Sequence, residues 1–236
     1  MVRSFDRDLF IKTTAAMIGV VMITYFLADI VHQSKIKELT TQHNIEIESI
    51  QDKNKKFTSG FLESSVILDS AREDRAFGNY YFELASLFYN IALSEKNSSS
   101  ISSYKNKTID NCSEAMPKYL ISHMNFIKSS EFFNSTIQYT DKPNYIKLLK
   151  LYVNLTKSGA RLTLLRYNAS KYLKYLAENI TIINDSAVLS ENATELMEMF
   201  NETMIMYGIE LSNFEEQEHE IDEYDIEGFS PIREPT

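Results

Sequence analysis

The chain has 236 residues and a net charge of −9, with 24 Lys and Arg against 33 Asp and Glu, one Cys and no Trp. The acidic balance argues against nucleic acid as a partner, and the single Cys112 excludes an internal disulfide, so it is a free thiol or a bridge to a second chain. Six Gly and four Pro are few turn-forming residues for this length, which predicts an all-α fold of long helices.

Residues 9–31 predict a membrane-spanning helix. Sixteen uncharged, mostly apolar residues lie between Lys12 and Asp29, and further apolar residues flank both charges. As an α-helix, the stretch from 9 to 31 would be about 34 Å long, which is enough to cross a bilayer. The two charged side chains could then reach the headgroups at opposite ends of the span. We therefore expect residues 9–31 to contact membrane lipid.

The span is expected to be an uncleaved signal anchor. A cleavable signal peptide ends in a small-x-small site, whereas the nearest candidate site here begins with Phe26. Arg3, Arg7 and Lys12 precede the span, which favours a cytoplasmic N-terminus and a single-pass protein of the cell membrane. The expected layout is a cytoplasmic stub (1–12), a transmembrane signal anchor (13–31), an extracytoplasmic domain (32–214) and an acidic disordered tail (215–236).

Ten of the chain's 17 asparagines begin an Asn-x-Ser/Thr triplet, the acceptor sequence (sequon) for N-glycosylation. The Ser and Thr content predicts about three such triplets by chance. All ten lie after residue 96, which places this part of the chain outside the cytoplasm unless the excess is only a drift toward a Ser- and Asn-rich composition. The expected glycan acceptors are Asn97, Asn106, Asn111, Asn134, Asn154, Asn168, Asn179, Asn184, Asn192 and Asn201.

Helical spacing of apolar residues continues beyond the anchor. An amphipathic, coiled-coil-like stalk that ends near residues 58–60 is predicted by Ile36, Leu39, His43, Ile47 and Ile50. A second helix over about 77–91 is predicted to bury Phe77, Tyr81, Leu84, Phe88 and Ile91. Residues 97–108 are rich in Ser, Asn and Lys, so we expect a glycosylated surface loop there.

Three more helices complete an expected antiparallel bundle of about four long helices. One runs from about Cys112 to Ile137, with Met116, Tyr119, His123 and Ile127 on its buried face. The next begins at Pro143 and is predicted to bury Tyr145, Leu148, Tyr152, Leu155, Gly159, Leu162, Ala169, Leu173 and Leu176. On this helix Asn154, Asn168 and Asn179 share the opposite, solvent face.

The last helix is expected over 192–214, with an apolar face of Ala193, Met197, Phe200, Met204, Tyr207, Leu211 and Phe214. Asn192 could cap this helix through its side chain, which would make it the poorest glycan acceptor. From Glu215 the composition becomes acidic and of low complexity, which predicts the disordered tail.

Charge is divided between the last two helices. Residues 142–174 hold eight Lys or Arg and no acid, whereas residues 175–232 hold fifteen acids and no Lys or Arg. Arg166 differs from its neighbours because it falls on the apolar face of its helix. We expect a buried ion pair between Arg166 and Glu198, Glu202 or Glu210; the alternative is that Arg166 binds an anionic ligand.

No constellation for catalysis, a cofactor or a metal is present in the sequence. It contains no phosphate-binding glycine loop, no G-x-S-x-G nucleophile elbow, no H-E-x-x-H and no zinc-ligand spacing. We therefore expect a membrane-anchored extracytoplasmic glycoprotein with a structural or protein-interaction role and no enzymatic activity, which associates with a protein partner or a second copy. The alternative is a ligand-binding sensor ectodomain, which would have to signal through a partner chain.

Overall fold

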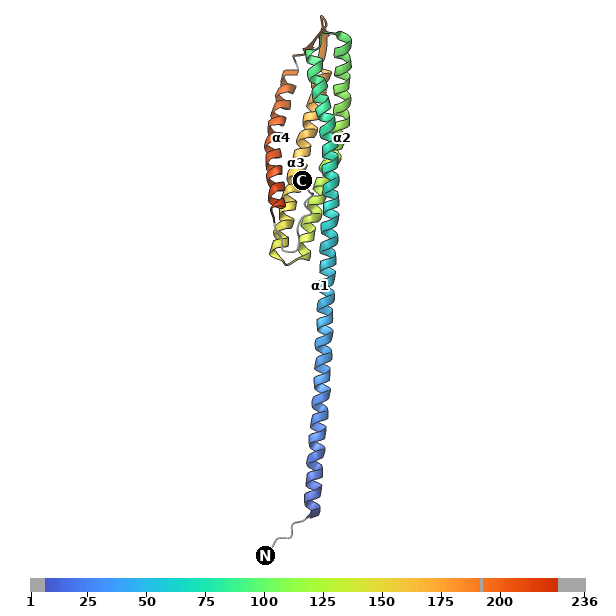
Figure 1. The fold of residues 1–236 in the computed structure, drawn as a ribbon, viewed down its shortest axis with the longest axis vertical. Helices are drawn as coiled ribbons and strands as arrows, with labels where there is room; N and C mark the ends of the chain where they lie inside the picture. Colours follow the sequence, from blue (N-terminus) through green and yellow to red (C-terminus); the bar gives the residue numbers. More distant parts are fainter. Residues whose placement is uncertain (1–6, 192, 225–236) are drawn as a thin grey trace. The chain divides into compact units, whose positions relative to one another are not determined.

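The computed structural model describes residues 7–191 and 193–224, and it describes side chains for residue 22 and from residue 24 onward within these ranges (Figure 1). The chain divides into two compact units, residues 1–53 and residues 54–236. The described helices are α1 (Arg7–Ser94), α2 (Ser98–Thr136), η1 (Ile137–Tyr139, a 3-10 helix), α3 (Pro143–Glu178) and α4 (Ala193–Asp222). A two-stranded antiparallel hairpin, β1 (Ile180–Ile183) and β2 (Ser186–Leu189), connects α3 to α4.

In the first unit, α1 is helical from Arg7, and every described side chain up to Lys53 is exposed. No helix of the described residues is both long enough and apolar enough to cross a membrane. About half of the side chains of the predicted anchor (13–31) lie outside the described set. Residues 1–6 of the predicted stub also lie outside the described residues.

The second unit is an antiparallel helical bundle formed by α1 from residue 54 onward together with α2, α3 and α4, as predicted (Figure 1). The connections are short: three residues join α1 to α2, and η1 with residues 140–142 joins α2 to α3. Short connections make consecutive helices antiparallel neighbours. Helix α3 packs against both α2 and α4.

Buried residues alternate at spacings of four and three along the helices, which is the heptad pattern of knobs-into-holes packing. On α1 this face consists of Ser64, Leu68, Ala71, Gly78, Phe82, Ala85, Tyr89 and Ala92. On α2 it consists of Thr108, Cys112, Ala115, Tyr119, Ser122, Phe126, Ser129, Phe133 and Thr136. Many of these side chains are small, which allows the helix backbones to approach closely.

The predicted buried faces of α1 and α2 are right only in part: Tyr119 is fully buried and most of the other predicted residues are half-buried, but the buried face of α1 lies one residue later along the chain. Phe77, at the start of the face predicted for α1, is 48% exposed, whereas its neighbours Gly78 and Phe82 are buried. On α2, Ile127 is 41% exposed and His123 is half-buried, while Phe126 is fully buried. The prediction followed the large apolar side chains, but the closest helix contacts are made by the small ones.

The predicted face of α3 is confirmed. Leu148, Leu155, Gly159, Leu162, Ala169, Leu173 and Leu176 are buried, and Tyr145 and Tyr152 are half-buried. A second buried stripe on α3, which includes Leu149, Val153 and Ala160, was not predicted. It arises because α3 has helices on two sides. The predicted face of α4 is also buried or half-buried throughout.

Three predicted boundaries are corrected. Residues 97–108 are not a loop: the Asn97 side chain accepts a hydrogen bond from the Ser100 backbone N–H (3.0 Å) and caps α2, and Ile101 is buried on its first turn. Helix α1 passes through residues 58–60 without a break, and Gly60 packs closely against Thr136 of α2. Helix α4 runs eight residues past Phe214 to Asp222.

The extension of α4 has a physical reason in the bundle. Arg72 of α1 donates a hydrogen bond to the Glu218 carboxylate (2.7 Å), and Ile221 packs partly buried against the core. These contacts hold the first part of the predicted tail in the helix. Residues 225–236 of that tail lie outside the described residues.

The hairpin was missed, although its turn has a sequence signal. Asn184 and Asp185 both have positive φ, 51° and 58°, as a type I′ turn requires. They separate Ile180-Thr181-Ile182-Ile183, in which every residue is β-branched, from the short run Ser186-Ala187-Val188-Leu189. Ile180 is buried in the core at the end of α3.

Gly159 lies where α3 packs tightly against α2. A Cβ atom at this position would lie 2.5 Å from Cε1 of Phe126, which is fully buried and has no room to move. At Gly208 of α4, by contrast, a Cβ atom would meet nothing within 4 Å.

Gly159→Ala should therefore destabilise the bundle by about 1–3 kcal/mol, as overpacked cores do. The matched Gly208→Ala should stabilise it by up to about 1 kcal/mol, because alanine is the better helix former. Urea unfolding monitored by helical circular dichroism measures both changes. Equal effects from the two substitutions would show that α2 and α3 do not meet at Gly159.

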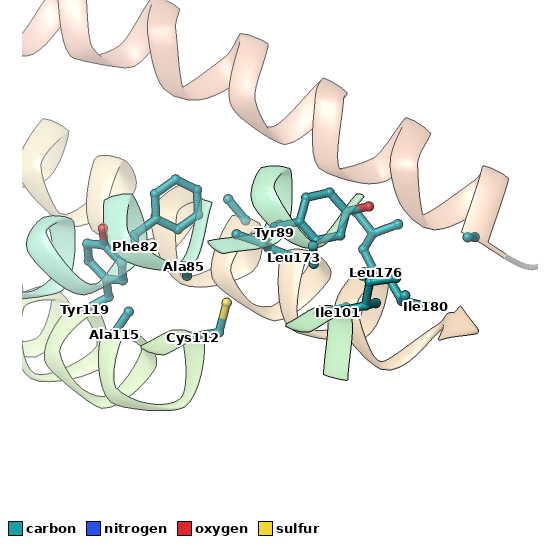
Figure 2. Packing of buried hydrophobic residues seen from close by; sticks show 14 residues of the cluster. Phe82, Ala85, Tyr89, Ile101, Cys112, Ala115, Tyr119, Leu173, Leu176 and Ile180 are labelled. Carbon is teal, nitrogen blue, oxygen red and sulfur yellow. The ribbon is translucent and has the colours of Figure 1, made fainter. Parts of the chain in front are cut away.

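Cys112 is fully buried in the core among residues of α1, α2 and α3 (Figure 2). Because it is fully buried, its sulfur cannot be reached by a second chain while the bundle is closed. Burial raises the pKa of the Cys112 thiol to about 12, with a smaller opposing effect from Lys174. The native state therefore keeps a proton that the unfolded chain releases from about pH 9, and this contribution to stability is lost as the pH rises from 9 to about 12.

Thiol reagents at pH 8 should label the native chain only through unfolding, and the denatured chain immediately. The measurement is the labelling rate of Cys112 with and without urea. The difference between the labelling rates of the native and the denatured chain should be smaller in the destabilised Gly159→Ala variant than in the parent chain. It should not be smaller in Gly208→Ala. Rapid labelling of the native chain would contradict the burial of Cys112.

Candidate functional site

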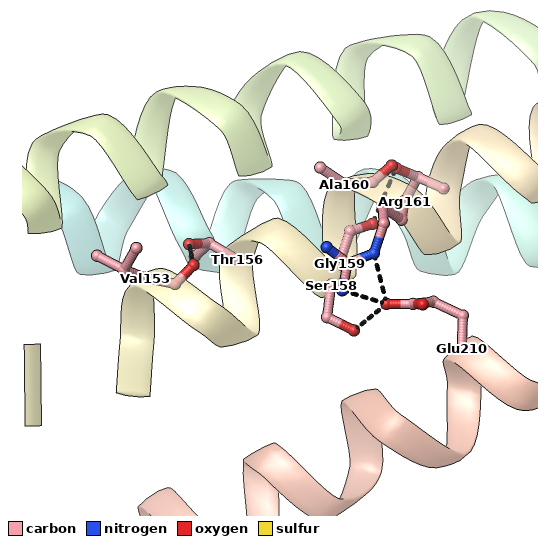
Figure 3. A network of polar contacts seen from close by, with 8 residues as sticks. Val153, Thr156, Ser158, Gly159, Ala160, Arg161 and Glu210 are labelled. Carbon is pink, nitrogen blue, oxygen red and sulfur yellow. Dashed lines mark hydrogen bonds and ion pairs between the residues drawn. The ribbon is translucent and has the colours of Figure 1, made fainter. Parts of the chain in front are cut away.

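A carboxylate, Glu210 of α4, is held at the α3–α4 interface by two donors from α3 (Figure 3). The buried Ser158 hydroxyl donates to Glu210 Oε1 (2.5 Å), and Arg161 donates to the same oxygen from Nε (3.0 Å) and lies 2.8 Å from it through Nη2. The Glu210 side chain is 14% exposed and that of Arg161 is 58% exposed. The network thus ties the two helices together at the edge of the core.

A groove of about 370 Å³ lies beside this network. Its lining residues are Arg161, Leu164, Leu165 and Asn168 from α3 and Met206, Ile209 and Glu210 from α4. The groove is mainly apolar, with Leu164 42%, Met206 56% and Ile209 62% exposed. Its volume lies within the range of small-molecule sites.

Arg166 lies on the inner face of α3, as predicted, but it forms no ion pair with any carboxylate of the described residues. Its guanidinium carbon lies 4.5 Å from the ring centroid of Phe82 on α1 and 3.9 Å from that of Tyr207 on α4. Nη1 contacts the Met204 sulfur (3.6 Å), and Nε has no hydrogen-bond partner among the described residues. The predicted partner Glu210 is engaged by Arg161 instead.

The physical reason for this correction is that aromatic faces stabilise a planar guanidinium without a counter-charge. Arg166 also joins the two core clusters, because Phe82 belongs to one and Tyr207 to the other. Aromatic residues on the helical stripes of α1 and α4 were visible in the sequence. Only the tertiary structure brings one from each helix against the same arginine.

Arg75 of α1 is a second inward arginine. It stacks on Phe214 of α4, which lies one heptad beyond Tyr207. Its guanidinium carbon lies 4.5 Å from the ring of Phe214, and Nη1 is unpartnered among the described residues. Burial lowers the pKa of Arg75, and the Glu218 carboxylate opposes that change. The sequence analysis did not single out Arg75, although it falls on the buried heptad stripe of α1.

The fully buried Tyr119 of α2 completes the polar interior of the bundle. Its hydroxyl donates to Asn79 Oδ1 on α1 (2.8 Å), and burial raises its pKa. On the same helix, His123 Nδ1 lies 2.8 Å from the Ala160 carbonyl oxygen, which can only accept, so Nδ1 is the protonated nitrogen. Tyr119 and His123 thus hydrogen-bond to other residues of the bundle and not to each other. Among the described residues, no three His, Cys, Asp or Glu side chains could hold a metal ion.

Nine of the ten predicted glycan acceptors are described, and none of them is buried; Asn192 lies outside the described residues. On α3, Asn154 is exposed and Asn168 and Asn179 are half-buried, so the face on which they were predicted does meet solvent. Asn168 also lines the groove. The Nδ2 atoms of Asn111 and Asn179, to which sugar would be attached, donate to backbone carbonyls one turn earlier.

Comparison of the chain with protein-family models, curated proteins and solved structures found no match. The function is therefore inferred from the chain's own residues. These provide a helical scaffold, an acidic and a basic helix side by side, one apolar groove, and asparagine acceptors on the surface.

Substitutions at Arg166 distinguish aromatic stacking from a hidden ion pair. Arg166→Ala should cost about 1–3 kcal/mol, because the aliphatic stem and the stacked guanidinium both lose contacts. Arg166→Met should cost much less, because it fills the space and strands no carboxylate. Were a buried acid paired with Arg166, the Met variant would be as damaging as the Ala variant.

The control for this prediction is Lys157→Ala, which removes an exposed side chain on the same helix and should cost less than about 0.5 kcal/mol. Urea unfolding midpoints of the three variants and the parent chain provide the comparison. Similar large losses from Arg166→Ala and Arg166→Met would contradict the stacking interpretation.

Proposed function

We propose that the chain is a single-pass, membrane-anchored glycoprotein whose helical bundle lies outside the cytoplasm and acts structurally or by binding other proteins, alone or as a subunit of a complex. The observation that carries the proposal is the excess of sequons, all of them after residue 96, in a chain with an apolar stretch at residues 9–31. The exposure of the described acceptors is compatible with this proposal.

An interaction role is supported by a sequon-free surface on α1. Between residues 54 and 94 the chain carries no sequon, whereas α2, α3 and α4 all carry at least one. This part of α1 exposes five large apolar side chains: Leu62, Val66, Phe77, Tyr80 and Leu87, each 48–67% exposed. Exposed apolar surface of this kind is typical of protein contacts, and sugar would not cover it.

The charge distribution also favours association through surfaces rather than catalysis. Of the basic residues on α3 and the acids on α4, Arg161 and Glu210 form an ion pair across the interface. Many of the remaining charges, including Lys150 and Lys157 on α3 and Glu198 and Glu202 on α4, are exposed. A basic and an acidic strip on one molecule could guide partners by electrostatic attraction.

Protease added to intact cells tests the topology. An N-terminal tag should survive on a fragment of a few tens of residues, and a C-terminal tag should be lost. A cytoplasmic marker protein must stay intact in the same sample, and it should be degraded after the cells are permeabilised. Survival of the full-length chain on intact cells would place the bundle in the cytoplasm and contradict the proposal.

A further inference from the structure

The helical sequons have a geometric property that divides the acceptors into two groups. In an α-helix successive residues are separated by about 100°, so the Asn and the Ser or Thr of one sequon lie about 200° apart. When the asparagine faces solvent, the hydroxyl residue two positions later faces the core. The strand and loop sequons have no such constraint.

Five sequons on α2, α3 and α4 have their hydroxyl residue in the core. Thr108, Thr156 and Ser170 are 0% exposed, Thr136 is 1% exposed and Thr203 is 9% exposed. Each hydroxyl donates to the backbone carbonyl four residues earlier, at 2.7–2.9 Å. The corresponding acceptors, called here the core-facing sequons, are Asn106, Asn134, Asn154, Asn168 and Asn201.

Four other sequons keep an exposed hydroxyl residue: Ser99, Ser113, Thr181 and Ser186. Their acceptors, called here the open sequons, are Asn97, Asn111, Asn179 and Asn184. Three of the four lie at a helix cap or on the hairpin, and Asn111 lies within α2.

N-glycosylation requires the Ser or Thr hydroxyl as well as the asparagine, so the transferase has to reach both. The reaction joins Asn Nδ2 to the anomeric carbon of a glycan, breaks the bond from that carbon to the phosphate of a lipid-linked donor, and releases a proton from Nδ2. In the folded bundle the hydroxyl residues of the core-facing sequons are buried among neighbouring helices, whereas those of the open sequons are exposed. The closed bundle therefore makes the Ser or Thr of these five sequons inaccessible to the transferase.

We infer that the core-facing sequons receive glycan on the unfolded chain, before the bundle closes, whereas the open sequons other than Asn97, whose side chain caps α2, remain acceptors after folding. The inference rests on the proposed glycosylated, extracytoplasmic state. Sugar added early does not prevent closure, because Asn106, Asn134, Asn154 and Asn201 are exposed and Asn168 borders the groove. The glycans can then remain on the surface while the hydroxyls become core.

Asn106 and Asn111 provide a matched pair on one helix. Asn106 is exposed, but its Thr108 is fully buried. Asn111 is half-buried and its Nδ2 donates to the Lys107 carbonyl (2.7 Å), but its Ser113 is exposed. Exposure of the asparagine alone predicts that Asn106 is the better acceptor in the folded chain. Exposure of the hydroxyl residue predicts the opposite order.

The first experiment uses the unglycosylated full chain, folded in detergent, with a purified oligosaccharyltransferase and a lipid-linked oligosaccharide donor. Synthetic peptides that carry each sequon serve as the unfolded reference. For each of the two sequons, the glycosylation rate in the folded chain is divided by the rate in the matching peptide. This ratio should be at least about tenfold smaller for Asn106 than for Asn111, because only rare open molecules expose Thr108. Equal ratios, or faster reaction at Asn106, would overturn the inference.

The second experiment is glycopeptide mass spectrometry of the chain purified from its own cells. Sugar on both groups of sequons, together with the slow reaction of the folded chain, supports addition before folding. Sugar on the open sequons with bare core-facing sequons would overturn the inference and leave the proposed function standing. Absence of sugar at every sequon would overturn both.

Discussion

The close approach of neighbouring helices is the constraint on which the rest of the bundle depends. Glycine lies under an aromatic ring at two contacts with α2: Gly78 of α1 under Tyr119, and Gly159 of α3 under Phe126. A Cβ atom at either glycine would come within 2.8 Å of the ring. Tight packing of this kind fixes the register of the helices, because a shift by one residue would put a side chain where the ring lies.

Once the register is fixed, the polar interior follows from it. The heptad stripes of α1 and α3 bring Arg75 and Arg166 inward, and α4 supplies Phe214 and Tyr207 to stack on them. A buried guanidinium without a carboxylate is costly unless its face is covered, and an aromatic ring provides that cover. Polar residues on a heptad seam are also a known means of specifying one alignment over others.

The same register couples the surface chemistry to the core. Because Asn and Ser/Thr of a helical sequon face opposite sides, small hydroxyl residues such as Thr108 and Thr156 fill the seam while their asparagines meet solvent. A seam built from Ser and Thr thus favours sequons wherever an asparagine stands two residues earlier. This relation makes the order of glycosylation and folding the informative measurement.

The sequence by itself determined the helical class, the existence of four bundle helices, and the inner faces of α3 and α4, because large apolar residues mark these faces at regular spacing. It located the faces of α1 and α2 only in part. The seams of these helices are rich in Gly, Ala, Ser and Thr; such residues carry little hydrophobic signal, and their burial depends on how near the next helix comes. The stacking partners of Arg166, the groove beside Glu210 and the burial of the sequon hydroxyls were decided only by the tertiary structure. Each of these requires residues from different helices at one level of the bundle, and the spacing within one helix does not contain that information.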